Sequence, residues 1–370
     1  MDPILTLGPL AVTPYGLAVF LGALCGVLLS LRKKENGPVL PFVILGALLI
    51  GHMWWVFFCP PGYAAETGTA LMMLQIWKGG YTLYGALFGG LLGAVIGSKL
   101  SGLNLLDVLD SLTPGACAAL FFTRLGEYFA CQGYGEAVYD ESLWFLPLSF
   151  CTYQEEGYQE WHCAVWAWEA VIALVLLAVL LVRARRAMRG EQAVLFVTVL
   201  GTTQILLEQM RDDDFVRLNP FVRFSQVAAL LSLIAVLVLL VCRRRPGLKR
   251  AAAGFAELTF ASLAVVFAEF VFDKPQDRPL LYIFSGLTAV GLAVLFRLWR
   301  SRLCLPVSVL MIAATGTLLG VHIADRWEND TWLLYGFMAL ALVAIGLTVY
   351  LNAKQDSPGA ADVPASSLPE

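Results

Sequence analysis

Two short stretches of the sequence place an arginine and a glutamate one helical turn apart, each at the end of an apolar segment. In TRLGEYFACQGYG, Arg124 precedes Glu127 by three residues, and in QILLEQMRDDD, Glu208 precedes Arg211 by three. A guanidinium presents paired N–H donors that fit the oxygens of a phosphate, and a carboxylate can accept a proton. These residues therefore suggest a site for a phosphate-bearing substrate. The structural alternatives are an interfacial ion pair for the first stretch and a charged helix end for the second.

The segments that carry these residues are too apolar for a soluble domain. Hydrophobic residues make up 59% of the chain, charged residues only 14%, and the mean hydropathy is +0.73. Apolar stretches near the length of about 20 residues that crosses a bilayer recur along the chain. We predict an all-α, polytopic integral membrane protein with about eleven transmembrane helices. The predicted spans are residues 15–32, 39–58, 81–98, 108–130, 164–182, 193–210, 224–242, 255–272, 280–297, 303–323 and 332–351.

Basic residues gather after the odd-numbered spans, as in RKK at 32–34 and RRR at 243–245. The loop at 131–163 instead contains no Lys or Arg and six acidic residues. Because Lys and Arg are enriched in the cytoplasmic loops of membrane proteins, the pattern puts the N-terminus outside.

The chain divides by composition after the seventh span. We predict a seven-span domain at 1–245 that holds the ionisable residues, a four-span extension at 246–352 with few polar residues in its span cores, and a disordered cytoplasmic tail at 353–370. Within the first domain, Gly85, Gly89, Gly93 and Gly97 recur every four residues, a pattern typical of closely packed membrane helices.

Four cysteines lie at or near the exterior side, where disulfides are permitted: Cys59, Cys131, Cys151 and Cys163. Spacing does not decide between disulfides and free thiols. The sequence has no CxxC or HExxH motif and no clustered histidines, so we expect no metal and no cofactor. We also expect no nucleic-acid partner.

Six segments between residues 8 and 242 resemble motifs of the prolipoprotein diacylglyceryl transferase family, bacterial membrane enzymes that transfer diacylglycerol from phosphatidylglycerol to a lipobox cysteine. The segments are TPYGLAVFLG, KGGYTLYGALFGG, DSLTPGACAALFFTRLGEYFACQGYG, WAWEA, LLEQMRDDD and RFSQVAALLSL. The resemblance implies the family's seven-span fold with an exterior N-terminus. It also implies catalytic roles for Tyr84, Arg124, Glu127 and Arg211, and substrate-binding roles for Tyr15, Gln132, Glu169, Glu208 and Gln226.

The same resemblance identifies positions where this sequence departs from the family. Tyr84 stands at the position of an active-site histidine, Glu127 and Ala130 at those of asparagines, Gln132 at that of a glutamate and Thr123 at that of a glycine. A histidine, with a pKa of about 6.5, accepts a thiol proton near neutral pH, whereas a tyrosine, with a pKa of about 10, is almost entirely protonated there. Glu127 would also compete with a phosphate for the neighbouring guanidinium. Three readings follow: Glu127 takes over proton transfer, the lipid headgroup differs, or the protein no longer turns over.

We therefore predict diacylglyceryl transfer from phosphatidylglycerol, or a related anionic lipid, to the cysteine of a prolipoprotein signal peptide, in the bacterial cytoplasmic membrane. Arg124 and Arg211 are expected to hold the phosphate, and Tyr15 either orients the headgroup or anchors its helix at the membrane interface. Two alternatives are a catalytically lapsed relative that binds anionic lipid or lipoprotein precursors, and a transporter, which repeat symmetry between the spans would favour.

Overall fold

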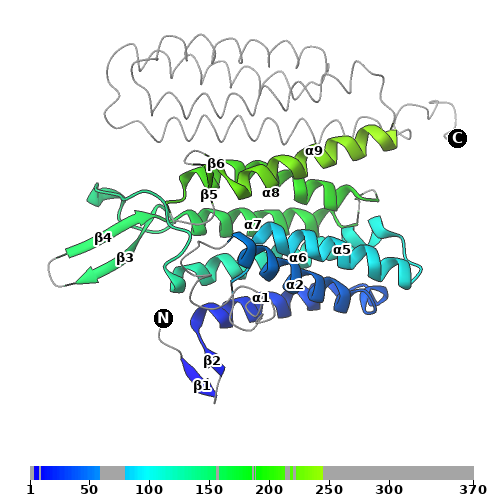
Figure 1. Cartoon of the computed structure of the whole chain (residues 1–370), viewed down its shortest axis with the longest axis horizontal. Helices are drawn as coiled ribbons and strands as arrows, with labels where there is room; N and C mark the ends of the chain where they lie inside the picture. Colours follow the sequence, from blue (N-terminus) through cyan, green and yellow to red (C-terminus); the bar gives the residue numbers. More distant parts are fainter. Residues whose placement is uncertain are drawn as a thin grey trace, which may run out of the picture. The chain divides into compact units, whose positions relative to one another are not determined.

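The computed structural model describes residues 4–7, 10–58, 80–155, 158–185, 187, 189–212, 217–219 and 222–244. Within these ranges the long elements are helices, each within a few residues of a predicted span (Figure 1). They are α1 (Pro14–Ser30), α2 (Leu40–Phe58), α5 (Leu83–Leu100), α6 (Leu105–Ala130), α7 (Val165–Arg183), α8 (Glu191–Met210) and α9 (Phe224–Arg244), with short 3-10 turns at Lys34–Asn36 and Glu141–Leu143. The predicted spans from 255 to 351 lie outside the described residues.

Four of the described helices, α2, α5, α6 and α7, are long and apolar enough to cross a membrane. Helix α1 is equally apolar in character and has 17 residues. Large apolar side chains on these helices are exposed, among them Phe20, Leu45, Ile96 and Val182. Such side chains are the expected outer surface of helices that face lipid.

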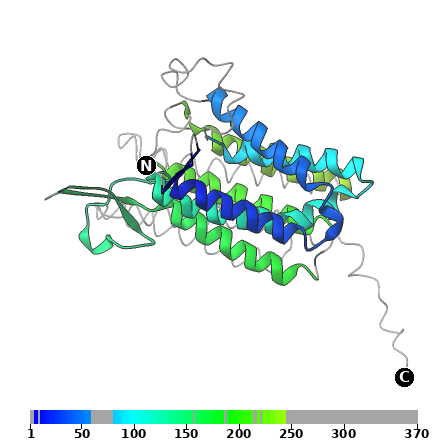
Figure 2. The same ribbon diagram turned by 90° about the horizontal axis from the view of Figure 1, so that it is seen from below.

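Glycines allow two pairs of helices to approach each other closely. Figure 2 shows α2 lying along α5, and a Cβ atom added to Gly89 would come within 2.1 Å of the carbonyl oxygen of Gly46. Helix α1 meets α6 in the same way, because a Cβ on Gly115 would lie 2.4 Å from the Gly26 carbonyl oxygen. The glycine stripe at 85–97 is buried along its length, which confirms that it is a packing surface.

The first half of α6 fixes the start of α8. The Asp110 carboxylate accepts hydrogen bonds from the backbone N–H groups of Gly190 and Ala193, and so caps the N-terminus of α8. Asp107 forms an ion pair with Arg189, with Oδ1 and Nε 2.8 Å apart. These contacts set where α8 begins, and therefore where its last residues lie.

Three antiparallel hairpins, which the all-α prediction did not include, lie before α1 and in two of the connections between helices. They are β1 (Leu5–Leu7) with β2 (Leu10–Val12), β3 (Ser149–Glu155) with β4 (Tyr158–Cys163), and β5 (Arg217–Asn219) with β6 (Val222–Arg223). The β3–β4 hairpin projects beyond the helix ends in Figure 1. Its strands are rich in aromatic residues, which favour extended backbone, and span hydropathy carries no information about such short elements.

The cysteines that were predicted to be exterior are not paired in the part of the chain that the structure describes. Cys131, Cys151 and Cys163 are all free thiols, whereas Cys59 lies outside the described residues.

The chain forms two compact units. One comprises Met1–Phe196 with Leu207–Ala229, and the other comprises Val197–Leu206 with Leu230–Glu370. Every residue of the predicted site belongs to the first unit, so the site is described within that unit alone.

Candidate functional site

Arg124 lies in the last two turns of α6 and is only 5% exposed. Its Nη1 contacts Glu127 Oε1, one turn along the same helix. Its Nε lies 3.0 Å from Glu169 Oε2 on α7, close enough for an ion pair, although the angle does not make a hydrogen bond. The Arg124 guanidinium is thus held between carboxylates from two helices.

Arg211 ends α8 and reaches the same carboxylate, with Nη1 3.7 Å from Glu169 Oε2. Its backbone is anchored to the loop after α6: Gly135 forms a β-bridge with Arg211, and the Asp212 N–H donates to the Tyr134 carbonyl at 2.9 Å. Residues from α6, α7 and α8, far apart in the sequence, therefore bring two guanidinium groups against one buried carboxylate.

A third arginine belongs to this cluster, and the sequence analysis did not select it. Arg223 is 5% exposed, and its guanidinium donates to the carbonyl oxygen of Arg211. Its backbone N–H donates to Gln226 Oε1 at 2.9 Å, as in the capping of a helix start by the residue three positions on. Gln226 is thereby connected to the cluster through Arg223. The signal that could have found Arg223 is its position on the side predicted to be exterior, where arginines are depleted.

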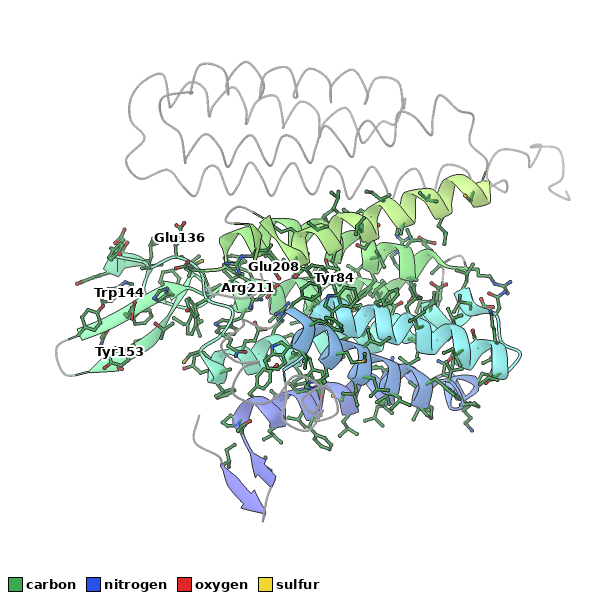
Figure 3. The ribbon with its side chains drawn as sticks, viewed as in Figure 1. Tyr84, Glu136, Trp144, Tyr153, Glu208 and Arg211 are labelled. Carbon is green, nitrogen blue, oxygen red and sulfur yellow. The ribbon has the colours of Figure 1, made fainter. Side chains whose placement is uncertain are left out.

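Tyr84 stands in the first turn of α5 with its hydroxyl buried, and the hydroxyl makes no hydrogen bond to any residue that the structure describes. It lies within electrostatic range of Glu208, Glu169 and Arg124. Figure 3 shows Tyr84, Glu208 and Arg211 in the same part of the molecule. The buried hydroxyl is therefore a hydrogen-bond donor that is not yet used among the described residues and that lies near the charged groups.

Tyr15 adds α1 to the site. Its ring packs against Gly126, where an added Cβ would come within 3.1 Å of Tyr15 Cδ2. The phenol lies within electrostatic range of Glu127, Arg124 and Arg211. The absence of a side chain at Gly126 thus lets the tyrosine approach the charged turn of α6.

Glu127 is 7% exposed, and its two oxygens have different surroundings. Oε1 contacts Arg124, whereas Oε2 is buried and has no hydrogen-bond partner among the described residues. Gly133 comes over this oxygen in a left-handed conformation, with φ of 66°, and a Cβ there would lie 2.4 Å from Oε2. A residue with a side chain at 133 would therefore collide with the carboxylate.

Gln132 lies just after the end of α6, and it contrasts with the buried Arg124, Glu127 and Glu169. Its side chain is exposed, and its backbone N–H donates to the Glu127 carbonyl at 3.1 Å. In the described part of the chain, no group of three His, Cys, Asp or Glu side chains is arranged to hold a metal ion.

A bundle of apolar helices that encloses arginines and glutamates at its end defines an integral membrane protein with an internal ionic site. The family model for prolipoprotein diacylglyceryl transferase matches residues 3–242, and the chain belongs to this family.

Three relatives with the name phosphatidylglycerol–prolipoprotein diacylglyceryl transferase are similar to this chain over nearly their whole length. The protein of Streptococcus suis is 28% identical over 256 residues, which cover 66% of this chain and 93% of the relative. That of Bacillus velezensis is 26% identical over 257 residues, with 65% and 91% covered. That of Bacillus licheniformis is 28% identical over 256 residues, with 65% and 92% covered.

Proposed function

We propose that the chain transfers the diacylglyceryl group of a membrane phospholipid, phosphatidylglycerol or a related lipid, to the lipobox cysteine of a prolipoprotein signal peptide. Family membership and the names of the relatives support the reaction class. The observation that carries the proposal for this chain is the convergence of Arg124 and Arg211 on Glu169, at 3.0 and 3.7 Å. Two cations held in advance at one point can stabilise the charge of a departing phosphate.

In this proposal the protein spans the bacterial cytoplasmic membrane several times, with its N-terminus outside. The distribution of basic residues supports the orientation. The predicted organisation belongs to the same proposal: seven spans in 1–245, four spans in 246–352, and a cytoplasmic tail at 353–370.

The reaction forms a bond between the cysteine sulfur and the terminal glycerol carbon of the lipid and breaks the bond from that carbon to the phosphate oxygen. The oxygen departs with the phosphate monoester, whose charge Arg124 and Arg211 stabilise. A phenol is protonated at neutral pH, so Tyr84 acts as a hydrogen-bond donor to the charged oxygen rather than as the base. The thiol proton passes to a carboxylate of the cluster, for which Glu127 and Glu208 are the candidates.

A second candidate function is lipid binding without turnover. The contact between Arg124 Nη1 and Glu127 Oε1 favours it, because this carboxylate occupies part of the guanidinium that a phosphate would need.

Arginine variants of the full chain test the proposal. Reconstituted in vesicles containing phosphatidylglycerol, the wild type should attach diacylglycerol to a lipobox peptide, which mass spectrometry detects as a thioether product. Arg124→Gln and Arg211→Gln should each slow transfer by about 100-fold, the usual loss when one charge-stabilising donor is removed. Arg185→Gln is the control, since Arg185 is exposed and precedes α8.

The outcomes separate the two functions. Lipid binding that both arginines require, without any thioether product from the wild type, would assign the protein to the binding class. Unchanged transfer in both variants would remove the phosphate site from the reaction.

A further inference from the structure

His162 lies on β4, and each of its two ring nitrogens faces an oxygen that can accept a hydrogen bond. Nδ1 lies 2.8 Å from the carbonyl oxygen of Gly135, and Nε2 lies 3.2 Å from Glu160 Oε1. The residue is only 8% exposed. A carbonyl and an ionised carboxylate accept hydrogen bonds without donating them, whereas a neutral imidazole has a single N–H group. The arrangement therefore fits the imidazolium, which carries a proton on each nitrogen.

Gly135 stands between His162 and Arg211. Its N–H donates to the Cys163 carbonyl at 2.8 Å and its own carbonyl faces His162 Nδ1, so both of its backbone groups are directed to β4. On its other side Gly135 forms the β-bridge with Arg211. The His162 ring also contacts the ring of Tyr134, with centroids 5.0 Å apart. His162 therefore holds the segment that is bridged to the backbone of Arg211.

We propose that His162, in its imidazolium form, is a positioning residue for Arg211 and thereby makes the phosphate site dependent on pH. The inference rests on the proposed function, in which Arg211 holds the phosphate. When the ring loses one proton, its two acceptors compete for the proton that remains. Because hydrogen bonds to an ionised carboxylate are the stronger ones, Glu160 keeps the donor and the Gly135 carbonyl faces a nitrogen lone pair. The hold on Arg211 is therefore present at low pH and is lost as the pH rises.

The titratable groups on the segments around His162 are mostly acidic. They are Glu160 on β4, Tyr134 and Glu136 after α6, Cys163 beside it in sequence, and Arg211 and Asp212 beyond Gly135. The β3 partner of His162 is Phe150, which is uncharged. The Arg211 guanidinium is directed to Glu169, with Nη1 3.7 Å from Oε2. Among the described residues, Glu160 is thus the charged group within ion-pair distance of the ring.

Substitution of His162 in the full chain tests the inference. Transfer to a lipobox peptide in phosphatidylglycerol vesicles is measured as kcat/KM at about pH 5.5 and about pH 8.5, on either side of the range in which histidine ordinarily changes charge. Each variant is compared with the wild type at the same pH, so that the pH dependence of the thiol and of the other carboxylates cancels. His162→Leu should lower kcat/KM about tenfold at the lower pH and less than about twofold at the higher pH, as expected for the loss of one charged donor.

Two polar variants make the test specific for the proton. His162→Asn keeps an N–H donor near the place of Nδ1 without a titration, so it should recover most of the loss seen in His162→Leu. Glu160→Gln provides an amide that accepts from the charged ring or donates to the neutral one, which leaves Nδ1 to the Gly135 carbonyl in both states. Both variants should therefore gain on the wild type as the pH rises. Glu141→Gln changes an exposed carboxylate of the same loop and should follow the wild type.

The pH dependence of these ratios separates positioning from stability. If His162→Leu slows transfer by the same factor at both pH values, His162 serves the fold alone and the inference is overturned. The inference also fails if Glu160→Gln keeps the pH dependence of the wild type. This second variant keeps the test decisive where the His162 variants do not fold.

Lipid binding by the same samples distinguishes failure of this inference from failure of the proposed function. Binding of phosphatidylglycerol in detergent, measured by isothermal titration calorimetry, should show ratios that change with pH in the same direction, because Arg211 holds the phosphate in the bound state as well. Such ratios without transfer by the wild type would refute the function and support the inference. Transfer whose ratios do not change with pH would support the function and overturn the inference.

Discussion

Arg124 shows how charged residues of this site compensate one another through ion pairs. An arginine within a membrane span costs about 2.5 to 3.5 kcal/mol to insert near the centre, and a partner or polar surroundings reduce this cost. Glu127 and Glu169 provide that partnership here, from the same helix and from its neighbour. The guanidinium is therefore charged and held in place before any substrate arrives. A phosphate that binds it must compete with two carboxylates.

The position of Arg211 depends on Arg223, which leads to a prediction at this scale. Because the Arg223 guanidinium donates to the Arg211 carbonyl, Arg223→Leu should displace Arg211 and lower kcat/KM for transfer by about tenfold, equal to one hydrogen bond from a charged group. Arg223→Lys keeps a cationic donor and should recover part of this loss. An equal loss in Leu and Lys variants, accompanied by a lower Tm in both, would show that Arg223 serves stability rather than the placement of Arg211.

Close packing between helices positions the residues of the site. Helix α5 presents Tyr84 at its start, and the stripe of glycines below it fixes the helix against α2. The first half of helix α6 has a structural role, because Asp110 caps α8, and its second half carries Arg124 and Glu127. Packing far from the charged cluster therefore determines where the charged groups meet.

Two adjacent glycines of α5 test this packing. Gly89→Ala would put a methyl group 2.1 Å from the Gly46 carbonyl oxygen, so α2 and α5 would have to separate, and overpacking of this kind costs about 1 to 3 kcal/mol. Gly90→Ala is the matched control, because its nearest neighbour would be Val43 Cγ1 at 3.7 Å, an ordinary contact. Thermal unfolding in detergent should show a clearly lower Tm for Gly89→Ala only; a larger effect at Gly90 would contradict the described packing.

The hairpin region offers a chemical test through its cysteines. Burial, and to a smaller extent the charge of Glu136, raise the pKa of the Cys163 thiol to about 11, whereas Cys131 is exposed. Only a thiolate reacts readily with maleimide, so at neutral pH Cys131 should be labelled and Cys163 should not, and Cys163 labelling should increase as the pH rises toward 11. Peptide mapping of the labelled wild type measures both. Equal labelling at neutral pH would show that the β4–α7 junction is open.

At the scale of the whole molecule, the same reagent tests the orientation in the membrane. A membrane-impermeant maleimide added to intact cells should label Cys131, because the loop at 131–163 lacks Lys and Arg and is predicted to be outside. Labelling of Cys131 only after the cells are opened would reverse the orientation.

The extension beyond residue 245 leads to the last prediction. The family match ends at residue 242, and all the charged residues of the cluster precede it. A chain that ends after Arg245 should therefore still bind phospholipid with the selectivity of the full chain, as measured by native mass spectrometry. Loss of binding in a truncated protein that still inserts into membranes would mean that the extension takes part in the site.

Elements whose signal is local could be predicted from the sequence. A span is recognised from its own hydropathy, and a helix with a glycine every fourth residue has a smooth face wherever it packs, so the described helices and the α5 stripe could be predicted. The Arg124–Glu127 contact could be predicted for the same reason, because side chains three residues apart on one helix lie next to each other.

Which distant residues meet, and which buried atoms lack a hydrogen bond, depends on the packing of the helices and could not be read from the sequence. The sequence suggested Arg124, Glu169 and Arg211 one by one, but nothing in it states that two guanidinium groups share one carboxylate, since this depends on how α6, α7 and α8 pack. The same holds for Arg223, which the sequence analysis did not select, and for Gln132, which was expected at the site and whose side chain is exposed. The unpaired oxygen of Glu127 follows from the fold of the Gly133 turn against α6, because hydrogen-bond satisfaction is a property of three-dimensional surroundings and not of residue type.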